Sequence, residues 1–305
     1  MNEIQLIERI RARAPHVAAS GIVTGIGDDC AVLRQAGSKD DLLFTTDMMI
    51  DGVHFHHLTH PAEAVGWKTL ARGLSDIAAM GGEPRFCLLS MALAEWTDQK
   101  WINGFYSGLL RLAAKTGTAL AGGDIAHSEV LACDIVVCGA APRGKALLRS
   151  GARKGDGIYV TGPLGGSALG LETGRGAAWK KHSKPEPRLD FGRSLRGRAT
   201  ACMDISDGIA MDLHRLCLAS GVSAELDEVP VFKGATIEQA LHGGEDYELL
   251  FTAPKPVKGA VRIGTIVAGK PGLVRYGGKR LEPIGYDHLQ SRMRRPREAA
   301  EFPEF

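Results

Sequence analysis

Acidic residues stand beside glycine, serine or threonine at six places along this chain, often where a strand-like run ends. One such junction would be an ordinary turn, because Gly-Asp is a favoured turn pair. Six in one chain predict that several carboxylates gather at strand ends, where glycine lets the backbone turn into loops. The six segments are Gly27–Asp29, Thr45–Asp47, Ser75–Asp76, Gly122–Asp124, Asp204–Gly208 and Gly243–Asp246.

Carboxylates packed this closely repel one another unless cations or protons neutralise them. An oxygen-rich cluster is typical of a divalent-cation site, and Mg²⁺ held by a few carboxylates commonly carries substrate phosphates. The pattern therefore indicates phosphoryl transfer. The chain has no Gly-x-x-x-x-Gly-Lys-Ser/Thr loop and no protein-kinase signature, and Gly25–Cys30 lacks the third glycine of a dinucleotide fingerprint. Metal ions and loop backbone must then hold the phosphates.

Composition limits the class of protein. The 39 glycines among 305 residues follow no fixed period, and 44% of residues are hydrophobic, which excludes a collagen-like or disordered chain. The net charge of +2 gives no general attraction to nucleic acid or membrane. The longest apolar run, Leu131–Ala141, is short and is interrupted by Asp134. Without a signal peptide in Met1–Pro15 or a Cys-x-x-Cys pair, the six cysteines predict reduced thiols in a cytoplasmic protein.

Apolar periodicity predicts an α+β protein with two α/β-type domains, an N-terminal domain over 1–148 and a C-terminal one over 149–305. The segment 175–198 is rich in basic residues and contains two prolines, so we expect an irregular surface segment there. Expected helices are Ala62–Met80, Trp101–Thr116, one starting at Ser167, and Ser206–Ser220. Expected strands are Leu42–Thr46, Arg85–Leu93, Leu131–Ala140, Gly157–Thr161, Tyr247–Thr252 and Val261–Ile266.

Two features allow other interpretations. His54, His56, His57 and His60 cluster in the sequence. They can be interpreted as a zinc site, as ordinary surface histidines, or as a set in which His54 contacts substrate. No cysteine lies nearby to complete a zinc site. The basic segment 175–198 is read as a nucleic-acid contact or as a solvated or phosphate-facing arm. Few aromatic residues are interleaved with its charges, which favours the arm.

The junctions as a set resemble the thiamine-monophosphate kinase family of the aminoimidazole ribonucleotide synthetase-like superfamily. The most specific segments are Thr45–Phe55 and Gly243–Glu248. The others are Gly25–Leu33, Leu74–Gly81, Gly122–Asp124, Leu148–Gly151, Val160–Gly162 and Asp204–Gly208, all in family order.

The resemblance implies ATP-dependent, Mg²⁺-dependent phosphorylation of thiamine monophosphate to thiamine diphosphate. It implies metal binding by Asp29, Thr45, Thr46, Asp47, Asp76, Asp124, Asp204 and Asp207. Nucleotide contacts are implied for Gly123, Asp124, Arg149, Ser206 and Tyr106. Substrate contacts are implied for His54, Glu245 and Tyr286, and a catalytic role for Asp47, Asp124 and Arg149.

The resemblance also implies a fold and an assembly. The N-terminal sheets of two subunits pair into a barrel, giving a homodimer, and the active site lies in the cleft between the two domains. Two positions depart from the family pattern. Ile125 follows Gly122–Asp124 where the family usually has threonine, and the stretch between Thr252 and Tyr286 is shorter than usual.

The acceptor phosphate of such a reaction is largely dianionic at pH 7, so it needs no general base. An aspartate-rich site suits direct in-line transfer, with Arg149 adding charge on the leaving side. The helix N-termini at Ser167 and at Ser206–Asp207 are candidate donors of backbone N–H groups to phosphate.

Rival interpretations are an aminoimidazole ribonucleotide synthetase, a selenophosphate synthetase, a hydrogenase-maturation enzyme of the same superfamily, or a non-catalytic protein that binds a divalent ion or a nucleotide. Selenophosphate synthetases use a cysteine near the N-terminus and the hydrogenase-maturation enzymes one at the C-terminus. In this chain no cysteine precedes Cys30, and none occurs in Glu301–Phe305.

Overall fold

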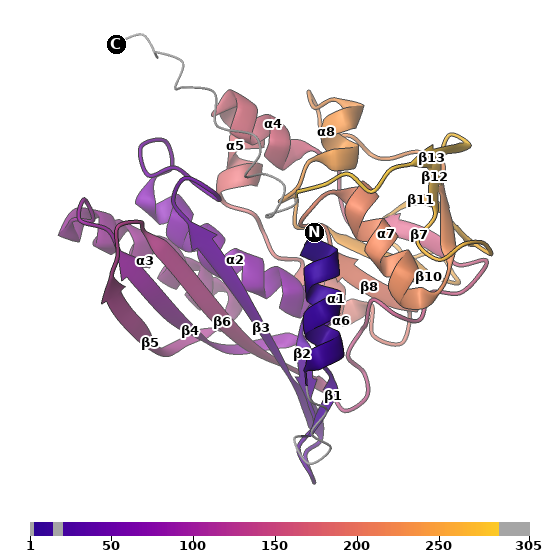
Figure 1. Ribbon diagram of the computed structural model, residues 1–305, viewed down its shortest axis with the longest axis horizontal. Coiled ribbons are helices and arrows are strands. Elements are labelled where there is room, and N and C mark those ends of the chain that lie inside the picture. The colour runs from indigo at the N-terminus through magenta and orange to yellow at the C-terminus, as the bar shows by residue number, and fades with distance from the viewer. Residues whose placement is uncertain (1–2, 15–20, 287–305) are drawn as a thin grey trace.

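The computed structural model describes residues 3–14 and 21–286, which form two sheets with helices packed on them (Figure 1). The first sheet has the strand order β1-β2-β3-β6-β4-β5. Its strands are β1 (Ile22–Thr24), β2 (Ala31–Leu33), β3 (Asp40–Ile50), β4 (Glu83–Leu93), β5 (Ala119–His127) and β6 (Ala132–Pro142). Only β4 and β5 pair in parallel.

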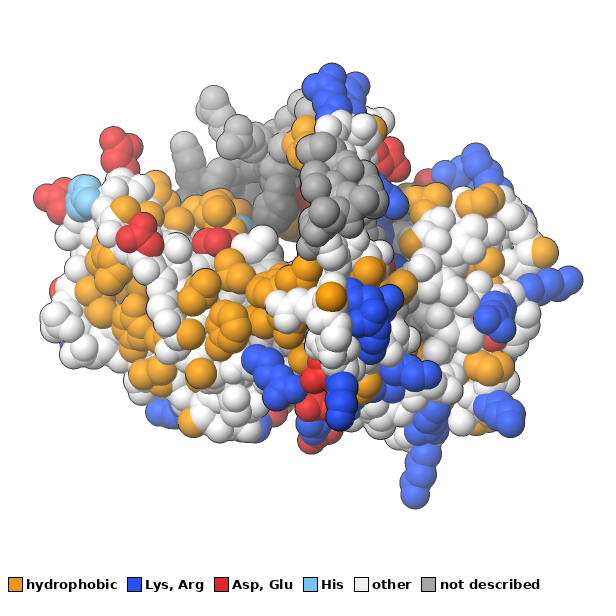
Figure 2. Space-filling model, turned by 90° about the horizontal axis from the view of Figure 1, so that it is seen from below, with side chains coloured by type: hydrophobic (Ala, Val, Ile, Leu, Met, Phe, Trp, Pro, Cys, Tyr) orange, Lys and Arg blue, Asp and Glu red, His pale blue; other side chains and the backbone are white. Residues whose placement is uncertain are grey.

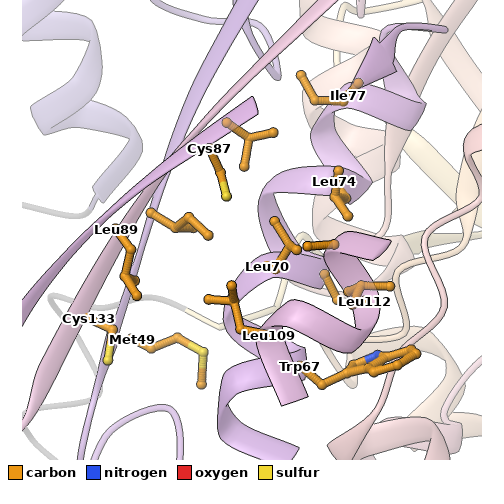
Figure 3. Close-up of a cluster of buried hydrophobic side chains, with 14 of the residues drawn as sticks. Met49, Trp67, Leu70, Leu74, Ile77, Cys87, Leu89, Leu109, Leu112 and Cys133 are labelled. Carbon is orange, nitrogen blue, oxygen red and sulfur yellow. The ribbon is translucent and has the colours of Figure 1, made fainter. Parts of the chain in front are cut away.

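Two long helices cover one face of this sheet, α2 (Ala62–Ala79) and α3 (Gln99–Thr116), as the apolar periodicity predicted. The Asp98 carboxylate caps α3 by accepting from the Trp101 N–H, and Gly117 ends it in the left-handed region. Apolar side chains of both helices meet those of the sheet in a buried core (Figure 3) that includes Leu70, Leu74, Ile77, Leu109, Leu112, Cys87, Leu89 and Cys133.

Helices α2 and α3 do not cover the other face of the first sheet. Met48 on β3 is 50% exposed and Leu88 on β4 is 38% exposed. Figure 2 shows apolar side chains gathered over this part of the molecule, on the face seen from below. The sheet ends at β1 and β5, so within the described residues it stays open and forms no barrel.

The second sheet has the order β13-β12-β9-β11-β7-β10-β8. Its strands are β7 (Gly157–Val160), β8 (Ala201–Asp204), β9 (Ser223–Leu226), β10 (Leu249–Ala253), β11 (Val261–Val267), β12 (Val274–Tyr276) and β13 (Lys279–Leu281). The helices of this half are α4 (Gly166–Thr173), α5 (Gly176–Ser183), α6 (Leu189–Ser194), α7 (Ile209–Ser220) and α8 (Ile237–His242). The first sheet ends at Pro142 and the second begins at Gly157, so residue 148 lies in the connection between them.

The expectation of an irregular segment over 175–198 is wrong, because α5 and α6 occupy most of it. The reason is non-local. The buried Glu248 carboxylate pairs with Lys181 at 2.5 Å and with Arg188 at 2.6 Å, and Glu248 lies far away in the sequence. The basic composition of the segment therefore reflects a specific internal partner as well as solvent contact.

The two halves meet along α2. Ser75 donates to Asp204 at 2.7 Å, and the Trp67 indole N–H donates to the Pro185 carbonyl at 2.8 Å. The remaining helix, α1 (Glu3–Arg13), buries none of its side chains. None of the described helices combines the length and apolar character needed to cross a bilayer. All six cysteines are buried and free of disulfides.

Candidate active site between the two sheets

A cavity of about 540 Å³ opens between the two halves of the chain. Strand β3, the loop after it and helix α2 line one side, and the loops after β8 and α8 line the other. Eight of the residues assigned from the sequence line it together: Asp47, His54, Asp76, Asp204, Ser206, Asp207, Glu245 and Tyr286. The cleft position implied by the resemblance thus coincides with a real cavity.

Three carboxylates converge beside this cavity. Asp29, Asp76 and Asp204 each offer an oxygen atom, and the three atoms lie within 4.8 Å of one another. Asp29 follows the bridge region before β2, Asp76 lies on α2, and Asp204 ends β8, so both halves contribute. Burial, reinforced by the neighbouring Asp29 charge, raises the pKa of Asp204 to about 7. Burial together with Asp47 and Asp204 also raises the pKa of Asp76.

The surrounding side chains form hydrogen bonds with these three carboxylates but leave one carboxylate oxygen without a hydrogen-bond donor. Thr45 donates to Asp76, and Arg149 donates through Nε to Asp29 Oδ1 at 3.1 Å. The other oxygen of Asp29, Oδ2, is buried and accepts no hydrogen bond. An unsatisfied buried carboxylate oxygen beside two carboxyls whose pKa is raised, Asp76 and Asp204, fits an oxygen-liganded divalent cation.

Asp47 lies beside the trio and is held by an arginine that sequence reasoning did not single out. Its Oδ1 atom accepts from Arg72 Nη2 at 2.8 Å and from Arg72 Nε at 3.2 Å. Burial raises the pKa of Asp47 in spite of this pair. On the other wall, Asp207 pairs with Arg215.

Both helix N-termini that were candidates for phosphate binding have their N–H groups occupied. The buried Asp246 carboxylate accepts from the backbone N–H groups of Gly165 at 2.6 Å and Ser167 at 3.0 Å. The Asp212 carboxylate accepts at 3.1 Å from Ser206, and likewise from the N–H groups of Asp207 and Gly208. These carboxylates shape the loops instead, so the expectation that the two termini offer these N–H groups to substrate is wrong.

Glu245 is positioned by strained backbone and by a buried lysine. Its φ is 64°, and Tyr247 two residues on has a φ of 50°, in the left-handed region that non-glycine residues rarely adopt. Its Oε2 atom accepts from Lys68 Nζ at 2.8 Å, and Lys68 is 1% exposed. Although burial acts to raise the pKa of Glu245, nearby positive charge, above all Lys68, lowers it to about 2.

The four clustered histidines do not converge on one point. His54 Nδ1 accepts from the Ile50 N–H at 3.0 Å, His57 pairs with Asp51 at 2.5 Å, and His60 Nε2 lies 3.2 Å from His182 Nε2. His56 and His57 bring ligand atoms within 4.8 Å of one another together with Asp51, and no such group of three among the described residues includes His54 or His60. A zinc site built from all four histidines is therefore not formed.

Four of the assigned residues lie away from the cavity. Thr46 donates its hydroxyl to Asp134 at 2.8 Å on the uncovered face of the first sheet. Tyr106 packs against the first core from α3. At Gly123, a Cβ atom would lie 1.8 Å from the Leu89 carbonyl oxygen, so strand packing alone requires glycine there.

Asp124 is the fourth, and the strand order explains its position. Asp124 pairs with Ser90, Ser90 with Asp134, and Asp134 with Met48, so these four residues form one row across the sheet. With strands about 4.8 Å apart, Asp124 lies about 14 Å from β3. Asp47 belongs to the adjacent row and points to the opposite face, toward α2. Asp47 and Asp124 of one chain cannot bind the same ion.

Sequence reasoning missed Lys68, Arg72 and His182. Lys68 and Arg72 lie one turn apart on α2 and reach Glu245 and Asp47 respectively. Their signal in the sequence was two cations on the apolar, buried part of a helix, which is uncommon unless the charges are paired. His182 lies in the segment expected to be irregular, and it is 1% exposed.

Comparison with known proteins identifies relatives over most of the chain. Residues 27–142 match the family model of the AIR synthase related protein, N-terminal domain, and residues 153–271 match that of its C-terminal domain. The thiamine-monophosphate kinase of Salmonella typhimurium is 38% identical over 271 residues, covering 82% of this chain and 82% of that protein. The enzyme of the same name from Bacillus subtilis is 38% identical over 277 residues, covering 83% of each.

Solved structures extend the likeness to three dimensions. AaThiL complexed with AMPPCP and TMP is 34% identical, covers 94% of this chain and 97% of its own, and superposes with a TM-score of 0.84. A hydrogenase maturation protein HypE in complex with ATP is 18% identical with a TM-score of 0.64, so it shares the fold alone.

Proposed function

The chain belongs to the thiamine-monophosphate kinases of the AIR synthase related family, and from this premise we propose how its residues transfer a phosphoryl group. The γ-phosphoryl group of ATP passes directly in line to the phosphate of thiamine monophosphate, giving thiamine diphosphate and ADP. The observation that carries the proposal is the convergence of Asp29, Asp76 and Asp204, from both halves of the chain, beside one cavity.

Mg²⁺ fits this set of oxygen donors, because Asp29 Oδ2 is buried without a partner and the pKa of Asp204 is raised. The residues that would hold the ions are Asp29, Thr45, Asp47, Asp76, Asp204 and Asp207. When bound, Mg²⁺ supplies the positive charge that lets two phosphate anions approach each other.

The residues of the chain then orient the two substrates. His54, Glu245 and Tyr286 line the cavity on the side where thiamine is proposed to bind. Arg149 and Ser206 are proposed to contact the nucleotide. Because the acceptor phosphate is largely dianionic at pH 7, no residue has to remove a proton from it. The contribution of the protein is position and charge, as in other phosphoryl transfers.

We propose that the enzyme works as a homodimer. Helices α2 and α3 leave one face of the first sheet uncovered, and the sheet ends at the exposed strand β5, which carries Gly123 and Asp124. A second copy seated on this sheet would cover the apolar side chains and close the barrel that one chain leaves open. Asp124 of the partner subunit would then complete the site around Asp47.

The six buried free thiols fit a protein kept in a reducing compartment, and we propose the cytoplasm as its location. Within such a compartment ATP is available as co-substrate.

The decisive experiment is an assay of the purified protein with ATP, Mg²⁺ and thiamine monophosphate, following thiamine diphosphate by chromatography. We expect product formation that stops when a chelator removes Mg²⁺. Absence of product from folded protein would contradict the function. A parallel assay for aminoimidazole ribonucleotide formation tests the nearest rival in the superfamily, and we expect it to be negative.

A further inference from the structure

Arg72 lies between the cavity residues proposed to hold the metal ions and those proposed to bind thiamine. It extends from α2, and its guanidinium reaches Asp47, next to the carboxylate trio. Burial acts to lower the pKa of Arg72, but the nearby carboxylates of Asp47 and Glu245 raise it, so the guanidinium stays cationic. Arg72 therefore lies between the side proposed to bind thiamine and the side proposed to hold the ions, and Arg149 serves Asp29 separately.

The guanidinium of Arg72 is only partly satisfied. Nε and Nη2 both donate to a single atom, Asp47 Oδ1, at 3.2 and 2.8 Å. The third nitrogen, Nη1, is buried and has no hydrogen-bond partner. A buried guanidinium nitrogen without an acceptor is costly, and a protein tolerates such a group mainly where a ligand satisfies it.

A cation bound to Asp47 would neutralise part of the negative charge of this carboxylate. A cation on Asp47 competes with Arg72 for the same carboxylate and weakens their pair. The planar guanidinium is then able to turn toward another anion, and its fork of donors matches phosphate oxygens better than an ammonium group does.

On the basis of this geometry and of the proposed function, we infer that Arg72 is a further catalytic residue, which binds an oxygen of the acceptor phosphate of thiamine monophosphate. It holds the acceptor phosphate beside the carboxylate cluster and offsets the charge that accumulates as two phosphates approach. The contrasting interpretation is that Arg72 only neutralises Asp47 and keeps the cavity wall in place.

Comparing two ligands separates these roles. Isothermal titration calorimetry, with Mg²⁺ and a non-hydrolysable ATP analogue present, measures the binding of thiamine monophosphate and of thiamine, which lacks the phosphate. We expect Arg72→Met to weaken binding of thiamine monophosphate about 10- to 100-fold and to leave thiamine binding within about threefold of the wild type. Arg72→Lys keeps the charge and loses the fork, so we expect an intermediate loss confined to thiamine monophosphate.

Arg111→Met is the matched control, because Arg111 is 58% exposed on α3 and pairs with Glu63 away from the carboxylate cluster. It should bind both ligands as the wild type does. Equal weakening of both ligands by the Arg72 variants, or no weakening of either, would overturn the inference. A wild-type protein that forms no thiamine diphosphate would instead overturn the proposed function, so the two failures are distinguishable.

Discussion

The ammonium group of the buried Lys68 lies 2.8 Å from a carboxylate oxygen of Glu245, whose side chain is 25% exposed, and this pair joins α2 to the loop that follows α8. Glu245 adopts a strained, left-handed backbone conformation, with a φ of 64°. Lys68 compensates by keeping the carboxylate ionised and directed toward the cavity wall. The position of the carboxylate therefore depends on a lysine 177 residues away in the sequence.

Replacing Lys68 tests this dependence. We expect Lys68→Met to lower the free energy of unfolding by about 3–5 kcal/mol, because it leaves Glu245 without its main counter-charge. Urea denaturation of wild type and variant measures the change. Arg262→Met is the control, since Arg262 and Asp227 are 50% and 64% exposed and an exposed pair contributes at most about 1 kcal/mol. Similar losses in both variants would contradict the assigned role of Lys68.

Asp47→Asn tests the carboxylate cluster as a reaction centre. The amide keeps the shape of the side chain but removes the charge proposed to bind Mg²⁺, so we expect kcat to fall by orders of magnitude with the fold intact. Steady-state assays and circular dichroism measure the two properties. Asp40→Asn, at the start of the same strand with a 45% exposed side chain, should leave kcat unchanged. Near-normal turnover of Asp47→Asn would remove Asp47 from the ligand set.

The raised carboxyl pKa values predict how stability depends on pH without divalent ions. Burial raises the pKa of Asp28 and of Asp204 to about 7, well above the usual value in an unfolded chain. The folded protein therefore holds protons that the unfolded chain has already released. Binding these protons stabilises the folded state, and this stabilisation is lost as the pH rises through 7. We expect Tm, measured in a chelator by calorimetry, to fall from about pH 6.5 to about pH 7.5 and to level off above that, where the folded protein has also lost these protons.

This pH range lies above the titration of the buried histidines. Burial, with the Lys68 charge, lowers the pKa of His182 to about 3, so His182 affects stability below the pKa of an unfolded histidine, about 6.5. Mg²⁺ should raise Tm more at pH 8.5 than at pH 6.5, because it replaces the lost protons. A Tm that is independent of pH and of Mg²⁺ across this range would show that the cluster is no cation site.

The separation of Asp47 from Asp124 predicts complementation between subunits. If Asp124 acts across a dimer, a heterodimer of Asp47→Asn and Asp124→Asn chains has one site with both changes and one with neither. Random assembly of the two inactive variants should then recover about a quarter of wild-type activity. Co-expression with two affinity tags isolates the heterodimer, which has one intact site of two and should show about half of wild-type activity in the same assay. No recovery in a verified heterodimer would place Asp124 in the site of its own chain or outside any site.

Local structure followed from the sequence where the cause is local. The apolar stripe over Ala62–Met80 predicted α2, and the junction at Asp204 predicted a carboxylate at the end of β8. The residue types also predicted the chemistry, since clustered aspartates beside glycine favour an oxygen-liganded cation whatever the strand order.

Which of these residues share one site was decided by tertiary structure. Strand β6 inserts between β3 and β4, and this order moves Asp124 across the sheet from Asp47 although both follow the same sequence pattern. Lys68 and Arg72 became site residues because α2 packs between the two halves, and α5 formed in a basic segment because Glu248 neutralises Lys181. Periodicity reports the neighbours of a residue along the chain, whereas burial and charge pairing depend on contacts that only the folded chain makes.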